Sequence, residues 1–309
     1  MNNVAGVVAG VIAAACFATH ATAQSSVPSA SVERAYTPLD LDKCKHTKGR
    51  EVEDYGSWRC TGYNGIPVRV SAGDQRTYIS FGPNAAKEIA ALNGRSVTFM
   101  AKYDFDDTGS SCHIHSSLWE QGADGAQHSA MYDHDAPHGM SDTFRWWLGG
   151  LIATAREFSL LWAPTINSYK RFQPGSWAPT GVGWGVDNRT LGFRKVGQGS
   201  GTRVECRIPG ADANSYHAFA GTIAGGLYGI EHRIEPPAPY EGNGYAANDI
   251  DRVPWNLSDA IDLWEGSAAA REAFGDDVHH HILTAAKAEW IAFNQTVTDW
   301  ELRRYFERI

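Results

Sequence analysis

The sequence predicts an α+β fold in which a small β-rich segment precedes a larger domain of strands and amphipathic helices. Residues 57–83 alternate apolar and polar side chains between glycine-rich turns, which is the pattern of short antiparallel strands. From about Gly94 onward, long segments carry apolar residues at helical spacing. We therefore expect a segment over 24–93 and a separate domain over 94–309, with no internal repeat in either.

The composition is that of a globular protein, with 43% hydrophobic and 20% charged residues. The formal net charge is -8. Since neutralising phosphates requires a clustered basic surface, this charge argues against a general nucleic-acid binder. Any anion that the protein binds must be met by a local group of basic residues.

The N-terminus has features of a secretory signal. An apolar run extends over residues 4–19, and the small residues at 21–23 fit cleavage before Gln24. The run is too short to span a bilayer as a stable helix. No Lys or Arg precedes Arg34, so a non-native start is the alternative. We predict a signal peptide over residues 1–23.

The cysteines divide into two groups. Cys16 lies in the predicted signal, and Cys44 and Cys60 flank a loop that a disulfide could close in an oxidising compartment. Cys112 and Cys206 stand among apolar neighbours, and we expect them to be small buried hydrophobic residues.

Three segments predict helices and one predicts a strand. Residues 140–164 begin with Ser and Asp, repeat apolar residues at helical spacing and stop at a proline. Residues 212–232 are nearly all apolar or small, which predicts a core helix. Residues 298–301 form a capping box that starts a last helix. Residues 96–105, "SVTFMAKYDF", predict a strand.

The stretch "TGSSCHIHSSLW" follows this strand and places two histidines one residue apart. Because alternate residues of a strand point to one face, His113 and His115 would project together. Neutral imidazoles are good metal ligands, but a carboxylate partner must come from elsewhere in the chain. The alternative is a pair of surface or structurally satisfied histidines.

Between residues 167 and 207 the chain carries an excess of arginine over acid, mixed with glycine, proline and tryptophan. Arginine's planar fork suits bidentate recognition of carboxylates and phosphates. A solvated basic face is the alternative. The arginines are Arg171, Arg189, Arg194, Arg203 and Arg207.

The pentapeptide "RVECR" adds geometry to this cluster. On a strand, Arg203, Glu205 and Arg207 share one face. Glu205 then either completes a metal site with His113 or pairs with its neighbouring arginines. Arginines, a carboxylate and paired histidines together suggest phosphoryl chemistry, which depends mainly on positioning and charge stabilisation.

Several motifs, in this order, resemble the C-terminal catalytic portion of the glutamine synthetase family. They are "TFMAKYDFDDTGSSCHIHSSLW", "NSYKRFQPGSWAP", "WGVDNRT", "RVECRIPGADANSYHAFA" and "TDWELRRYFERI". The resemblance covers residues 94–309 and implies an antiparallel sheet with packed helices. It also implies an ATP-dependent ligase that phosphorylates glutamate and then joins it to ammonia or a larger amine.

By this resemblance, His113 and Glu205 match ligands of a catalytic Mg²⁺ or Mn²⁺ ion that coordinates the ATP phosphates. Gly109 matches a loop that contacts the substrate glutamate. Arg171 and Arg207 match arginines that hold the glutamate carboxylate and the developing γ-glutamyl phosphate.

The resemblance also implies a nucleotide side to the site. Arg189 and Arg194 match arginines on the transferred phosphoryl group and the nucleotide phosphates, so Arg189, Arg171 and Arg207 are the expected catalytic residues. His115, Ser117 and Arg203 match further nucleotide-side positions.

The chain departs from the family at the amine position. Ammonia-using members carry a glutamate in the loop after the first arginine motif, where this chain has Trp177 within "PGSWAP". An apolar wall there indicates the branch that joins glutamate to larger amines, such as the γ-glutamylpolyamine synthetases. A core aromatic residue is the alternative for Trp177.

A second departure concerns the residues before 94. The family's N-terminal domain and first-metal glutamates have no counterpart there, and the segment instead resembles short exported proteins. We therefore expect an incomplete synthetase, weakly active or inactive alone, with the family's homo-oligomer in doubt. The catalytic resemblance implies a cytoplasmic location and the signal an exported one. The alternative function is a non-catalytic exported protein whose N-terminal segment is the operative part.

Overall fold

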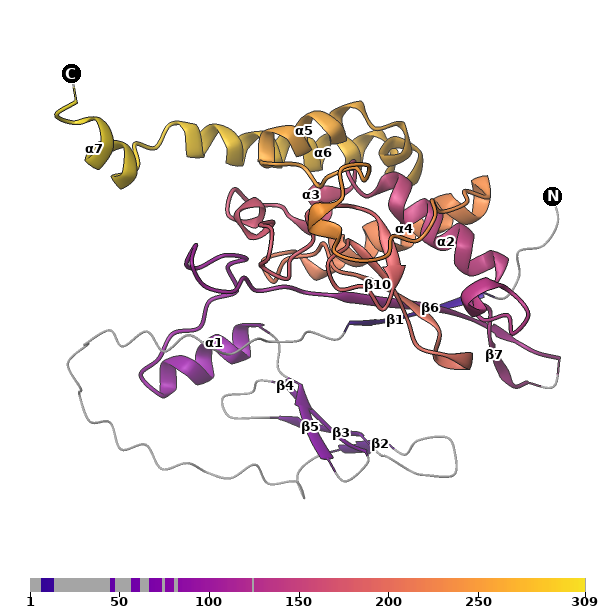
Figure 1. Cartoon of the computed structure of the whole chain (residues 1–309). Coiled ribbons are helices and arrows are strands. Elements are labelled where there is room, and N and C mark those ends of the chain that lie inside the picture. The colour runs from indigo at the N-terminus through magenta and orange to yellow at the C-terminus, as the bar shows by residue number, and fades with distance from the viewer. Residues whose placement is uncertain are drawn as a thin grey trace. The chain divides into compact units, whose positions relative to one another are not determined.

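A computed structural model describes residues 7–13, 45–47, 57–61, 67–73, 76–80, 83–123 and 125–308. The chain divides into two compact units, which are considered separately. One comprises His20–Thr98, and the other joins Met1–Thr19 to Phe99–Ile309. Figure 1 shows their elements along the chain.

The smaller unit contains a four-stranded antiparallel sheet, as the alternating pattern predicts. Its strands, in spatial order, are β2 (Lys45–Thr47), β3 (Ser57–Thr61), β4 (Pro67–Gly73) and β5 (Arg76–Ser80), and helix α1 (Pro83–Leu92) follows. The possible disulfide between Cys44 and Cys60 involves Cys44, which lies outside the described residues.

The larger unit is built on a six-stranded sheet. Its order is β1 (Val7–Ala13), β6 (Ile114–Gln121), β10 (Arg203–Cys206), β9 (Phe193–Val196) and β8 (Trp184–Val186), and β7 (Gln127–Ser129) also pairs with β6. Strand β1 lies within the segment predicted to be a signal, and its backbone pairs antiparallel with β6. Whether the segment directs export stays a prediction.

The expectation of a purely antiparallel sheet is wrong at one edge, because β8 and β9 are parallel. Strand β8 has only three residues, so a loop of six residues is long enough to return the chain to the N-terminal end of β8. Strand β9 then starts beside the first residue of β8 and runs in the same direction. Asp187 opens this loop in the left-handed region, with φ of 52°. Its N–H donates to the Lys195 carbonyl at 3.0 Å, which fixes the return.

Six α-helices follow β6 in the larger unit. They are α2 (Asp142–Thr154), α3 (Ser159–Trp162), α4 (Ser215–His232), α5 (Leu257–Gly266), α6 (Ala268–Asn294) and α7 (Asp299–Tyr305). The predicted helix over 140–164 starts correctly, since the Ser141 hydroxyl caps the Phe144 N–H at 3.1 Å. The predicted helix is divided into α2 and α3 by a turn at residues 155–158. Phe158 in this turn and Trp162 at the end of α3 are both fully buried.

The last predicted helix is confirmed with its cap. The Thr298 hydroxyl accepts from the Glu301 N–H at 3.3 Å, and the Glu301 carboxylate accepts from the Thr298 N–H at 2.7 Å. Among the described residues, none of the helices has the length and apolar character needed to cross a membrane.

The predicted strand over 96–105 is wrong. The Lys102 N–H donates to Asn167 Oδ1 at 2.8 Å, and Asn167 Nδ2 donates to the Lys102 carbonyl at 2.7 Å. The Asn167 side-chain amide thus satisfies both backbone groups of Lys102, which a neighbouring strand would otherwise have paired. The segment is held in place without a ladder.

Glycines bring α2 and α4 into backbone contact, as the predicted core character of residues 212–232 requires. A β-carbon added at Gly150 would lie 2.2 Å from the Gly225 carbonyl oxygen and 2.4 Å from the Gly229 Cα. Trp147 of α2 then donates to the Ser116 hydroxyl of β6 at 3.0 Å. The two helices (Figure 1) therefore form the layer that supports one face of the sheet.

The Gly150→Ala substitution tests this crossing. We expect it to lower the free energy of unfolding by roughly 2–3 kcal/mol, because backbone atoms cannot move aside as a side-chain tip can. Gly266→Ala is the matched control, since nothing lies within 4 Å of a β-carbon there. Urea denaturation measures both, and equal stabilities of the two variants would contradict the packing described.

Candidate functional site

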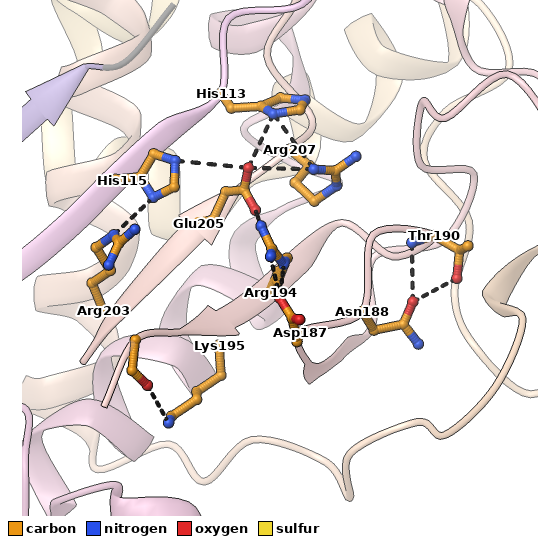
Figure 2. A network of polar contacts seen from close by, with 11 residues as sticks. His113, His115, Asp187, Asn188, Thr190, Arg194, Lys195, Arg203, Glu205 and Arg207 are labelled. Carbon is orange, nitrogen blue, oxygen red and sulfur yellow. Dashed lines mark hydrogen bonds and ion pairs between the residues drawn. The ribbon is translucent and has the colours of Figure 1, made fainter. Parts of the chain in front are cut away.

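The site lies on the face of the sheet turned away from the helices. Ile114 and Leu118 of β6 are buried in the core, and the alternating residue His115 points to the opposite face. His115 pairs in register with Glu205 of β10, which pairs with Arg194 of β9. One cross-strand row therefore carries an imidazole, a carboxylate and a guanidinium (Figure 2).

Glu205 is the centre of this row. Its Oε1 lies 3.0 Å from His113 Nδ1 and 3.7 Å from His115 Nε2. Arg194 donates to Oε2 at 2.9 Å, and Arg207 donates to Oε1 at 3.3 Å. Burial acts to raise the pKa of Glu205, but hydrogen bonds from His113 and Arg194 and the charge of Arg207 hold it well below its usual range. The carboxylate is therefore ionised at neutral pH.

Both histidines are neutral at that pH, because burial lowers the pKa of each. The contact with ionised Glu205 requires the proton of His113 to sit on Nδ1, so the 3.5 Å approach of Arg207 to the same nitrogen is not a hydrogen bond. Arg203 Nε donates to His115 Nδ1 at 3.1 Å, which leaves the proton of His115 on Nε2, facing Glu205. The prediction that the two histidines project together is confirmed.

Arg194 joins two carboxylates. Its Nε donates to Asp187 Oδ1 at 2.9 Å, Nη2 also contacts Asp187, and Nη1 donates to Glu205. Partial burial acts to lower the pKa of Arg194, but these hydrogen bonds raise it overall. Asp187 therefore fixes Arg194 against Glu205.

Arg171 and Gly109, both predicted to contact substrate, lie together. Arg171 is 2% exposed, and burial lowers its pKa to about 10. It donates from Nη2 to the Ile208 carbonyl, while its Nε has no hydrogen-bond partner in the described part of the chain. A β-carbon at Gly109 would lie 2.6 Å from Arg171 Cγ. Only glycine therefore lets this loop lie against the aliphatic part of the buried Arg171 side chain.

Arg207 connects the carboxylate to the loop that contains Trp177. Its Nη2 donates to the Trp177 carbonyl at 3.1 Å. Trp177 has φ of 62°, and 63% of its surface is exposed. The alternative of a core aromatic residue is wrong for Trp177, whose ring is free to meet a ligand.

The remaining predicted residues lie away from Glu205. Arg203 reaches the site through His115, whereas the Ser117 hydroxyl accepts from Trp119 Nε1 at 3.1 Å. Arg189 is exposed. It lines a cleft of about 720 Å³ together with Trp177 and the segment 239–242.

The described residues do not complete a divalent-metal site. His113 and Glu205 supply two suitable donor groups, but no group of three or more His, Cys, Asp or Glu residues able to hold a metal ion is found over the described ranges. Both oxygens of Glu205 already face guanidinium groups, whose positive charge opposes a cation there. The Mg²⁺ or Mn²⁺ ion that the resemblance implies therefore does not fit this donor set alone.

The two cysteines near the site are free thiols. Cys206, the last residue of β10, is buried in the core, and burial raises its pKa to about 12. This confirms the expected role of a small hydrophobic residue for Cys206. Cys112 is only partly buried, so the expectation of a buried residue is wrong there, although its partial burial still raises its pKa.

Sequence reasoning missed Asn188 and the segment 237–242. Asn188 Nδ2 donates to the Tyr240 carbonyl at 3.2 Å and to the Gly242 carbonyl at 2.9 Å. An Asp-Asn pair followed by Arg and Thr is a signal for a turn held by side-chain hydrogen bonds. This pattern predicts the turn, but it does not predict that the turn binds the distant segment 237–242.

The fold and this arrangement agree with a match of residues 74–305 to the model of the glutamine synthetase catalytic domain. The chain belongs to the glutamine synthetase family. The match begins upstream of residue 94, where the motifs begin.

Several known proteins are similar to this chain. It is 54% identical over 224 residues to the γ-glutamylethanolamide synthetase GlnA4 of Streptomyces coelicolor, covering 72% of this chain and 46% of that protein. It is 39% identical over 232 residues to a glutamate–isopropylamine ligase of a Pseudomonas species, covering 74% and 50%.

A solved structure of a GmaS/ADP complex is similar at a TM-score of 0.64 and 30% identity, covering 72% of this chain and 52% of that one. The chain spans about half the length of the curated relatives it matches.

The shifted histidines predict a pH dependence of stability. A histidine in the unfolded chain takes up a proton as the pH falls through about 6.5. In the folded chain, His113 and His115 stay neutral to a lower pH, because burial lowers the pKa of both. Stability is therefore full above pH 6.5 and falls below it, by up to about 1.4 kcal/mol per pH unit for each histidine. The pKa of Glu205 is also lowered in the folded chain. Its contribution to the free energy of unfolding is therefore lost below about pH 4.3, where the carboxyl group takes up a proton in the unfolded chain.

Urea denaturation between pH 7.5 and 4.5 measures this slope. His113→Asn, which retains a donor toward Glu205, is expected to flatten it. His134→Asn is the control, because the His134 side chain is 85% exposed. An unchanged slope in His113→Asn would show that His113 is not held neutral.

Proposed function

We propose that this chain acts in the ATP-dependent joining of glutamate to a primary amine, through γ-glutamyl phosphate. Family membership supports the reaction class. The observation that carries the proposal is the convergence of His113, Arg194 and Arg207 on one buried carboxylate, with Arg171 buried nearby.

The proposed reaction has two steps. An oxygen of the glutamate side-chain carboxylate attacks the γ-phosphorus of ATP, and ADP leaves. The amine nitrogen then attacks the acyl carbon, inorganic phosphate leaves with the C–O electron pair, and the nitrogen loses a proton. Both steps place negative charge on phosphoryl and carbonyl oxygens, which fixed guanidinium groups stabilise without reorganisation.

The residues divide these tasks by position. Arg207 is buried and held on both sides, by Glu205 and by the Trp177 carbonyl, so it presents a fixed charge. We assign it and Arg171 to the glutamate carboxylate and the acyl phosphate. Arg189 is exposed in the cleft and is assigned to the transferred phosphoryl group. His115, Ser117, Arg194 and Arg203 are assigned to the nucleotide side.

The exposed Trp177 supports an amine larger than ammonia. A tryptophan ring provides an apolar wall where the ammonia-using members have a carboxylate, so it favours an amine with a carbon chain. The names of two similar proteins, a γ-glutamylethanolamide synthetase and a glutamate–isopropylamine ligase, refer to such amines.

The chain as it stands is expected to be a weak catalyst. The family's divalent metal needs more donors than His113 and Glu205, and the described residues add none. We therefore propose that full activity, and the family's oligomer, require residues outside those described. The need for ATP favours a cytoplasmic location, whereas the predicted signal favours export.

Nucleotide binding tests the proposal. We expect ATP with magnesium to bind the full-length chain in isothermal titration, and Arg189→Ala to weaken this binding about 10- to 100-fold through loss of a charge-assisted contact. Arg189 is exposed, so the variant should fold normally. Arg271→Ala removes a comparably exposed arginine from α6 and serves as the matched control.

Absence of ATP binding by the folded chain would overturn the proposed function. Amide formation from ATP, glutamate and an amine, followed by mass spectrometry, tests the expected weak catalysis separately. Turnover as fast as that of a full-length relative would contradict it.

A further inference from the structure

The cleft that contains Arg189 has a second wall, formed by residues 239–242 at the end of the segment 237–242. It faces a space also lined by Trp177, Val186 and Asn188. Nothing in the reaction described above uses this wall. Its chemistry is that of a specificity pocket, because it combines aromatic and apolar surface with a few polar groups.

Hydrogen bonds between its backbone and Trp184 of strand β8 fix this segment in place. Trp184 Nε1 donates to the Pro237 carbonyl at 2.6 Å, and the Tyr240 N–H donates to the Trp184 carbonyl at 2.8 Å. Gly185 permits this approach, since a β-carbon there would lie 2.8 Å from the Tyr240 carbonyl oxygen. The wall is therefore preformed on strand β8.

Asn188 ties the wall to the turn that carries Arg189. Its Nδ2 donates to the carbonyls of Tyr240 and Gly242, and its Oδ1 accepts from the N–H and hydroxyl of Thr190 at 3.0 and 2.7 Å (Figure 2 shows the Thr190 contacts). The amide is thus occupied by internal bonds. It positions the wall and leaves recognition to other groups.

Two carboxylates line the cleft, and they differ in availability. Asp187 is paired with Arg194. Glu241 is exposed, and no ion pair or hydrogen bond of its side chain is found within the part of the chain that the structure describes. Glu241 is therefore the acceptor left for a ligand, on the same wall as the ring of Tyr240.

We propose that Glu241 binds the end of the amine substrate that lies farther from the reacting nitrogen. The substrate is then a primary amine whose chain ends in a second hydrogen-bond donor, either a hydroxyl or an ammonium group. This rests on the proposed function, because the near nitrogen must face the acyl phosphate beside Arg189. The carbon chain then lies against Trp177 and Tyr240. A carboxylate accepts from either donor, whereas a plain alkylamine offers it nothing.

Saturation-transfer NMR titration of the full-length chain tests this with three probes of similar size. They are 2-aminoethanol, 1,3-diaminopropane and propylamine. We expect both bifunctional amines to bind more tightly than propylamine. Glu241→Gln should weaken the diamine at least tenfold and the amino alcohol severalfold, while propylamine changes less than twofold. The larger of the two losses identifies the distal donor as ammonium or hydroxyl.

Glu231→Gln, on the exposed side of α4 and outside the cleft, is the matched control and should change none of the three. Trp177→Ala should weaken all three, since each chain lies against the ring. Equal binding of the three probes, or equal effects of Glu241→Gln on them, would overturn the assignment of Glu241. ATP binding without amine binding would overturn this inference alone, whereas loss of both would overturn the proposed function with it.

Discussion

The site depends on one interaction, the contact of the ionised Glu205 carboxylate with cationic and imidazole groups from three strands and their ends. Glu205 is 4% exposed, and Arg207 beside it is 5% exposed. A buried guanidinium without a counter-charge costs several kcal/mol, so removing one member of such a group destabilises the others. Glu205 therefore allows Arg194 and Arg207 to be buried at fixed positions.

The fold provides the surface on which this interaction forms. Helices α2 and α4 approach through glycines and cover one face of the sheet, which leaves the opposite face for polar residues. His115 and Glu205 are 90 positions apart in the sequence and meet because β6 and β10 are neighbouring strands. A rigid sheet face of this kind can hold several charged groups at fixed distances, as phosphoryl transfer requires.

The parts of this structure that the sequence predicts are those governed by neighbouring residues. Strand alternation placed His113 with His115 and Glu205 among arginines, and the spacing of Thr298 and Glu301 located a helix start. The failures involve distant partners. The strand expected over 96–105 is replaced by the Asn167 amide, and the parallel β8–β9 edge depends on the fold of one short loop. The cleft wall over 239–242 was missed because Asn188 binds it across more than 50 residues.

The arrangement has a consequence for proton positions that can be observed directly. Glu205 fixes the proton of His113 on Nδ1, and Arg203 leaves that of His115 on Nε2. Nitrogen-15 NMR of the imidazole rings at pH 7 distinguishes these tautomers from each other and from the charged ring. Two neutral rings with those opposite tautomers are the expected result. A charged ring at either position, or the same tautomer at both, would contradict the central place of Glu205 in this site.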